Sequence, residues 1–203
     1  MNRFLLRKIC NSAQRVTLSL FSNWNIYGAE NIPASGSIIV ISNHLSNIDP
    51  SIISASLPRP IWFLAKSSLF KNPIARVFLN LYGAFPVNRS TSDISAIQWI
   101  LDRLKEDQAV VIFPEGKRNY NGLQKADNSF AKLAIKSNTY ILPIGITGTE
   151  NMQYVTRVFN PTGKITIKFG KPFKIISKNE KITKENMNSI NESIICLLYT
   201  SDA

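Results

Sequence analysis

Histidine and cysteine are scarce in this chain of 203 residues. There is one histidine, His44, and the two cysteines, Cys10 and Cys196, lie near opposite ends. A structural zinc site needs about four such ligands grouped at short spacing. Two isolated thiols are typical of a protein from a reducing compartment. We therefore expect no bound metal ion.

Long apolar runs are also missing. No stretch approaches the roughly 18 apolar residues that a membrane-spanning helix needs. Arg7, Lys8 and Arg15 interrupt the apolar residues of the amino-terminal segment, and no small-residue cleavage site follows. We therefore expect neither a spanning helix nor a cleaved secretory signal.

Several motifs of common enzyme classes do not occur. The chain has no glycine-rich loop of the mononucleotide or dinucleotide type, which argues against ATP and NAD sites. It has no Gly-x-Ser-x-Gly elbow and no suitably placed cysteine motif. A covalent enzyme nucleophile is therefore not indicated, and no cofactor is expected.

Acidic residues are few. Against 13 Asp and Glu stand 24 Lys and Arg, which gives a formal net charge of +11. Such a protein attracts anions, whether nucleic acid, an anionic membrane surface, a phosphorylated substrate or an acidic carrier protein. Charge alone does not choose among these partners.

The first part of the chain, residues 1–24, has the pattern of a basic amphipathic helix. An apolar row recurs at helical spacing, and basic residues fall away from it. We predict a helix in the membrane interface; the alternative is a helix packed on its own domain. The row is Leu6, Ile9, Ala13, Val16 and Leu20, and the basic residues are Arg3, Arg7, Lys8 and Arg15.

Residues 25–203 alternate short apolar runs with helical patterns, which predicts one α/β domain with a largely parallel central sheet flanked by helices. Ligands in such folds bind beyond the carboxyl ends of strands. The expected strands are 36–42, 61–65, 84–87, 109–114, 140–146 and 164–170, and the expected helices are 69–82, 94–104, one around 130–134 and 184–199.

The segment "SNHLSNIDP" (42–50) follows the first of these apolar runs and holds His44 and Asp49. Pro50 suits the first position of a helix, so we expect a helix from Pro50 with Asp49 as its N-cap. Two interpretations of Asp49 are open. In the first, Asp49 only caps the helix in a polar turn. In the second, one carboxylate oxygen caps the helix and the other orients His44, which acts as a general base near neutral pH.

Three further blocks carry polar residues after expected strands. "YGAFPVNR" (82–89) ends in Arg89, "VVIFPEGKRN" (110–119) holds Glu115 and Arg118, and "ILPIGITGTE" (141–150) centres on Pro143. Arginine binds phosphate in a bidentate manner. Taken singly, each block is equally well explained by solvated strand ends and turns.

In order and spacing, the four blocks resemble the glycerolipid acyltransferase family from about Tyr27 to Glu150. The family pattern has a His and an Asp separated by four residues, then Gly-x-Phe-x-x-x-Arg, then Phe-Pro-Glu-Gly-Thr-Arg-Ser, then a proline-centred block. The resemblance implies that His44 deprotonates an acceptor hydroxyl and that Asp49 orients His44. It implies that the substrate-binding residues are Arg89 and Arg118 for the acceptor's phosphate and Glu115 with Gly116 for its glycerol part.

Two positions depart from the family pattern, since Lys117 replaces threonine and Asn119 replaces serine. Lys117 adds a cation beside the expected phosphate site. Lys66 and Lys71 also reach phosphate in one interpretation and are solvated surface lysines in the other. For the acyl chain, candidate lining residues that equally suit core packing are Trp62, Phe63, Phe70, Phe78 and Leu79.

The expected activity is acyl transfer from acyl-CoA or acyl carrier protein, as co-substrate, to a lysophosphatidate-like acceptor in phospholipid biosynthesis. The expected location is peripheral, at the cytoplasmic face of the cell membrane, with an anionic membrane surface and no nucleic acid as partner. Three alternatives remain. One is an acyltransferase that acts on another lyso-lipid head group, and one is a thioesterase, in which water replaces the acceptor. The third is a basic nucleic-acid-binding protein, although the sequence has no basic run with interleaved aromatics and no helix-turn-helix signature.

Overall fold

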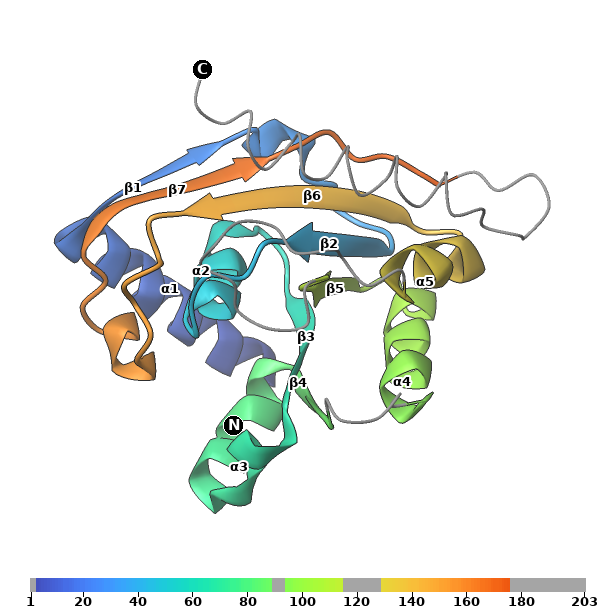
Figure 1. The fold of residues 1–203 in the computed structure, drawn as a ribbon, viewed down its shortest axis with the longest axis horizontal. Coiled ribbons are helices and arrows are strands. Elements are labelled where there is room, and N and C mark those ends of the chain that lie inside the picture. Colours follow the sequence, from blue (N-terminus) through green and yellow to red (C-terminus); the bar gives the residue numbers. More distant parts are fainter. Residues whose placement is uncertain (1–2, 89–93, 115–128, 176–203) are drawn as a thin grey trace.

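The computed structural model describes residues 3–88, 94–114 and 129–175, with side chains of 129–132 excepted. Within these ranges the chain forms one seven-stranded sheet with helices on both sides (Figure 1). The helix expected at 184–199 lies outside the described residues.

The sheet is largely parallel, as predicted. Its strand order is β1-β7-β6-β2-β5-β3-β4, and among these neighbours only β6 and β7 are antiparallel. The strands are β1 (Ser22–Tyr27), β2 (Ile38–Ser42), β3 (Ile61–Lys66), β4 (Ala84–Val87), β5 (Ala109–Ile112), β6 (Tyr140–Thr147) and β7 (Gly163–Phe169). Because β2, β5, β3 and β4 run parallel, their carboxyl ends share one edge of the sheet.

The middle strand, β2, shows why apolar runs in the sequence predicted strands well. All five of its residues are buried, because it pairs with β5 on one side and β6 on the other while helices cover both faces. A strand buried in this way reads as a continuous apolar run. The edge strand β1 was not predicted, since "SNWNIY" is polar and half-exposed and owes its conformation to pairing with β7.

Helices lie on both faces of the sheet. The apolar core on one face includes Leu18 of α1 and Ile53 of α2, and the core on the other includes Leu101 of α4 and Leu133 of α5. The helices are α1 (Arg3–Phe21), α2 (Asp49–Ser56), α3 (Pro73–Tyr82), α4 (Ile94–Lys105) and α5 (Ser129–Ser137), with short 3-10 turns η1 (Ala29–Asn31), η2 (Ser67–Lys71) and η3 (Val155–Val158).

The amino-terminal helix, α1, packs on its own domain and also exposes apolar side chains, and its place in a membrane interface stays a prediction. It packs on α2, α3 and β1 and buries Leu6 and Leu18. It also exposes Ile9, Val16 and Leu20, by 53%, 56% and 71%. Leu6 therefore points inward and does not belong to the exposed apolar row. Within the described ranges, no helix has the length and apolar content to cross a membrane.

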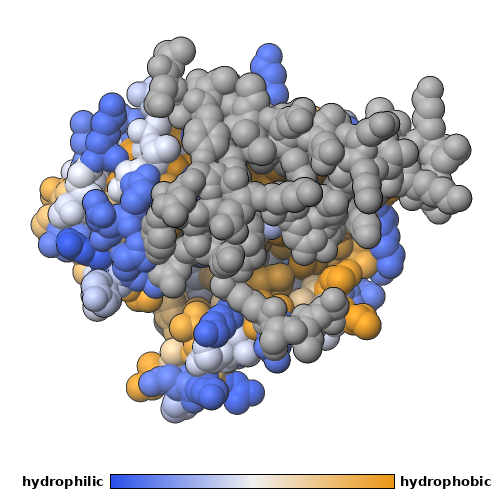
Figure 2. All heavy atoms as spheres, in the orientation of Figure 1, coloured by the Kyte–Doolittle hydropathy of each residue, from blue (hydrophilic) through white to orange (hydrophobic). Residues whose placement is uncertain are grey.

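The helix α3 also exposes apolar side chains. Ile74, Val77 and Phe78 are 80%, 60% and 44% exposed. Figure 2 shows apolar side chains among polar ones at the lower end of the molecule, where Figure 1 places α3. Asn72 begins this helix by accepting hydrogen bonds from the amides of Ile74 and Ala75, which separates it from η2.

Candidate active site

The candidate site lies in the loop that follows β2, and Asn43 fixes the path of this loop. Its side-chain amide donates to the carbonyl of Ile146 at 2.8 Å, and its side-chain oxygen accepts from the amide of Ile146 at 2.9 Å. This pair of bonds holds the loop against β6, the neighbouring strand. His44 comes next in the chain and is therefore presented at the carboxyl end of the central strand.

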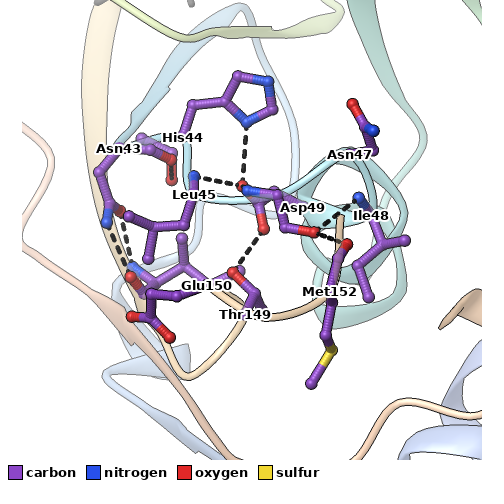
Figure 3. A network of polar contacts seen from close by, with 12 residues as sticks. Asn43, His44, Leu45, Asn47, Ile48, Asp49, Thr149, Glu150 and Met152 are labelled. Carbon is purple, nitrogen blue, oxygen red and sulfur yellow. Dashed lines mark hydrogen bonds and ion pairs between the residues drawn. The ribbon is translucent and has the colours of Figure 1, made fainter. Parts of the chain in front are cut away.

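His44 and Asp49 are in direct contact. Nδ1 of His44 lies 2.9 Å from Oδ2 of Asp49 (Figure 3). Asp49 is fully buried and His44 is 7% exposed. The imidazole also stacks on the ring of Phe113, with centroids 4.2 Å apart. Hydrogen bonding of Nδ1 to a carboxylate selects the tautomer in which Nε2 is unprotonated and available as a base.

The prediction that Asp49 is the N-cap of the helix is wrong. Helix α2 begins at Asp49 itself, with Ile48 at the N-cap position, and Pro50 follows within the first turn. The backbone amides of Leu45 and Ser46 donate to Oδ2 at 2.7 Å each, and the hydroxyl of Thr149 donates to Oδ1 at 2.8 Å. The carboxylate therefore organises the loop before the helix instead of the first helical turn.

A cavity of about 670 Å³, here called the His44 cavity, lies beside the imidazole. Its lining is mainly apolar and comes from α1, α2, α3, β3, η2, η3 and the loops beside them. Of the residues expected to line an acyl site, Phe63, Phe78 and Leu79 do so, whereas Trp62 packs in the core on the other face of the sheet and Phe70 packs beside the first core. A cavity of this size and lining suits an amphiphilic ligand.

A thiol and a phenol also border the His44 cavity. Burial raises the pKa of the Cys10 thiol, and burial raises the pKa of Tyr82 to about 12. Both therefore stay protonated near neutral pH, and Cys10 is a poor nucleophile. Among the described residues, no three His, Cys, Asp or Glu side chains come together to hold a metal ion.

The structure places four of the predicted site residues. His44 and Asp49 are in contact, and Lys66, exposed at the end of β3, borders the His44 cavity. Lys71 is exposed at the end of η2 and is not among the residues that line this cavity. The other predictions lie outside the described residues; they are Arg89, Glu115, Gly116, Lys117 and Arg118.

Sequence reasoning missed Thr149, Asn43 as an anchor and Phe113. Thr149 is fully buried and contacts Asp49 across 100 positions of sequence. Its only signal was its place in the fourth block, eight residues after the start of "ILPIGITGTE". A hydroxyl with no motif of its own is indistinguishable from a surface threonine until the fold brings β6 beside β2.

The fold and the site together define a class. A histidine and carboxylate pair at the carboxyl end of a central parallel strand, beside an apolar cavity, is the arrangement of a candidate active site in an α/β enzyme.

Comparison with known proteins specifies the family. Residues 23–147 match the model of the family described as Acyltransferase, and the chain belongs to this family. The chain is 31% identical to a 1-acyl-sn-glycerol-3-phosphate acyltransferase of Borreliella burgdorferi, over 81% of this chain and 67% of the relative. It is 27% identical to the Bacillus subtilis enzyme of that name, over 92% of both chains. The predicted family and the predicted class of enzyme, an O-acyltransferase, are confirmed.

A solved structure confirms the predicted fold class. The chain superposes on the crystal structure of PlsC, the 1-acyl-sn-glycerophosphate acyltransferase of Thermotoga maritima, with a TM-score of 0.75. The match covers all of this chain and 82% of the other at 23% sequence identity. At this identity the likeness concerns the fold alone.

Proposed function

We propose that this enzyme transfers a fatty acyl group from acyl-CoA or acyl carrier protein to the free hydroxyl of lysophosphatidate, with His44 as the general base. The observation that carries the proposal is the 2.9 Å contact between His44 Nδ1 and Asp49 Oδ2 beside an apolar cavity. The names of the relatives supply the acceptor.

The reaction needs no covalent intermediate on the enzyme. Nε2 of His44 takes the proton of the acceptor hydroxyl, and the oxygen attacks the thioester carbonyl carbon to form a C–O bond. The resulting oxyanion collapses, the C–S bond breaks, and the thiolate takes the proton from the imidazolium. Asp49 stabilises the imidazolium in between. A base placed in this way contributes about 10²–10⁴-fold in rate.

The His44 cavity supplies a place for the acyl chain. Phe63, Leu79 and Phe113 give it an apolar wall, and Phe113 also contacts the imidazole. An acyl chain lying along this wall brings its thioester carbonyl toward Nε2. Burial of the chain favours binding by about 25 cal/mol per Å² of apolar surface. Lys66 at the rim is placed to attract the acidic head of either substrate.

We also propose that the enzyme works at a membrane surface, on its cytoplasmic face. The supporting feature is the apolar α1–α3 groove, defined by Leu6, Pro73, Ile74, Val77, Phe78 and Leu81. Phe78 belongs to both this groove and the His44 cavity, and Leu69, which is 50% exposed, also borders that cavity. A bilayer in contact with α1 and α3 would therefore adjoin the cavity through these side chains.

The test is an acyl-transfer assay with the full chain, one labelled acyl-CoA and a panel of acceptors. We expect phosphatidate from lysophosphatidate, little product from other lysolipids, and little free fatty acid without an acceptor. His44→Ala should lower the rate by about 10²–10⁴-fold. Undiminished transfer by this variant would remove His44 from the mechanism, and rapid acid release without acceptor would make the enzyme a thioesterase.

A further inference from the structure

The carboxylate of Asp49 is held by four donors of which three share one oxygen. Oδ2 is contacted by Nδ1 of His44 and by the backbone amides of Leu45 and Ser46. Oδ1 accepts from the hydroxyl of Thr149 at 2.8 Å (Figure 3). Asp49 and Thr149 are both fully buried, so water does not replace this last bond.

The bond from Thr149 has a geometric consequence that the others lack. The torsion that turns an aspartate carboxylate has a broad energy profile, so contacts to one oxygen leave the other able to swing. A second bond on Oδ1 fixes the plane of the group. The orientation of the carboxylate in turn fixes Nδ1 of His44, whose ring is otherwise held by stacking on Phe113.

The loop that carries Thr149 is built to hold it there. Gly148 has φ +85°, and a Cβ on it would lie 1.9 Å from the carbonyl oxygen of Lys164, so only glycine fits this turn. Before the turn, Ile146 exchanges two hydrogen bonds with Asn43. After it, the carbonyl of Met152 accepts a bond from the hydroxyl of Ser46. The loops after β2 and β6 are thus joined on both sides of Thr149.

We propose that Thr149 is a positioning residue for the acyl-transfer reaction, acting through Asp49 on His44. This inference rests on the proposed function, because it gives the orientation of the base a catalytic consequence. The hydroxyl touches neither substrate nor His44. Its contribution is to keep the carboxylate in the one rotation that holds Nδ1 and leaves Nε2 directed at the acceptor.

The test compares Thr149→Val, which has the same shape without the hydroxyl, with Thr149→Ser, which restores the donor. The matched control is Thr139→Val. Thr139 is 2% exposed, directly precedes β6 and bonds to Ser137 and Ser37, away from Asp49. Steady-state kinetics are measured with acyl-CoA and lysophosphatidate. Because His44 is the only histidine, NMR of the imidazole reports its Nδ1 proton without overlap.

We expect Thr149→Val to lower kcat by about 10- to 100-fold with KM within about twofold, as for a lost bond to a charged group. The downfield Nδ1 proton signal of His44 should weaken or shift. Thr149→Ser should recover most of the rate, and Thr139→Val should change neither readout.

Two results would overturn the inference. One is full activity and an unchanged imidazole spectrum in Thr149→Val while His44→Ala is inactive; this leaves the proposed function standing. The other is equal kinetic loss in Thr149→Val and Thr139→Val, which would mean general destabilisation. If His44→Ala retains activity, the proposed role of His44 as the base fails, so the two failures are distinguishable.

Discussion

Among single residues, Arg7 is notable because it is a buried cation. It is 6% exposed, and its guanidinium lies over the ring of Trp62 at 4.2 Å. Its Nε and Nη2 atoms have no hydrogen-bond partner in the part of the chain that the structure describes. Burial, and next the nearby charge of Arg3, lower the pKa of Arg7 to about 10. The charged form therefore opposes folding below this pH.

We expect Arg7→Met to leave the free energy of unfolding unchanged or to raise it, by up to about 2 kcal/mol at pH 7.5. Removal of a buried charge that lacks full pairing among the described residues stabilises, and loss of the contact with Trp62 offsets part of the gain. Because the pKa falls on folding, the penalty is complete below pH 10 and is relieved only as pH rises above that value. Urea unfolding measures the difference.

Arg76→Met is the control for this substitution, because Arg76 is exposed on α3. It should change stability by less than about 0.5 kcal/mol. A loss of more than about 1 kcal/mol in Arg7→Met alone would show that the guanidinium contributes favourably and would contradict this account.

Among single residues, the sequence also predicted the pair at the candidate site but only part of its support. His44 and Asp49 alone were a weak signal, and they were recognisable because four blocks follow one another in the order and spacing of the family pattern. The need for glycine at position 83, in the second block, depends on a contact that the sequence pattern does not show. It ends α3 at φ +105°, and a Cβ there would lie 2.1 Å from Nη2 of Arg7. Local sequence patterns do not predict contacts between segments that are far apart in the chain.

Among the elements, α3 offers a site at which a substitution tests the proposed membrane surface. Ile74, near its start, is 80% exposed, and Ile94, at the start of α4, is 77% exposed. Ile74 borders the α1–α3 groove, whereas Ile94 lies away from it. The two isoleucines are therefore matched in type, exposure and helical position.

We expect Ile74→Asp to weaken sedimentation with anionic vesicles by about tenfold and Ile94→Asp to leave it unchanged. A buried charge and a lost apolar contact together cost on the order of 1–3 kcal/mol at a membrane interface. Circular dichroism checks that both variants remain folded. Equal binding by the two variants would place the membrane contact elsewhere on the enzyme.

The elements also show where local patterns predict well. Apolar runs located β2, β3, β5 and β6 because these strands are buried by helices on both faces. The same signal missed β1, which is half-exposed at the edge of the sheet. For α1, periodicity predicted the helix, but it took the packing to show that Leu6 faces the domain while Ile9 and Val16 face outward.

For the whole molecule, the net charge of +11 predicts that the proposed membrane binding depends on salt and on the charge of the lipid. Attraction of a basic protein to an anionic surface is long-ranged and is screened by salt, whereas apolar insertion is not. We expect binding to phosphatidylglycerol vesicles to fall several-fold between 50 and 300 mM NaCl and binding to phosphatidylcholine vesicles to be weak at both. Salt-independent binding would contradict an electrostatic contribution.

In the proposed mechanism His44 and Asp49 act as one unit in proton transfer, and a comparison of single and double variants tests this coupling. Acyl-transfer rates are measured for His44→Ala, Asp49→Asn and the double variant, with circular dichroism to confirm folding. Groups that act together lose activity together. We predict that the double variant is no slower than His44→Ala; losses that multiply in the double variant would contradict the account.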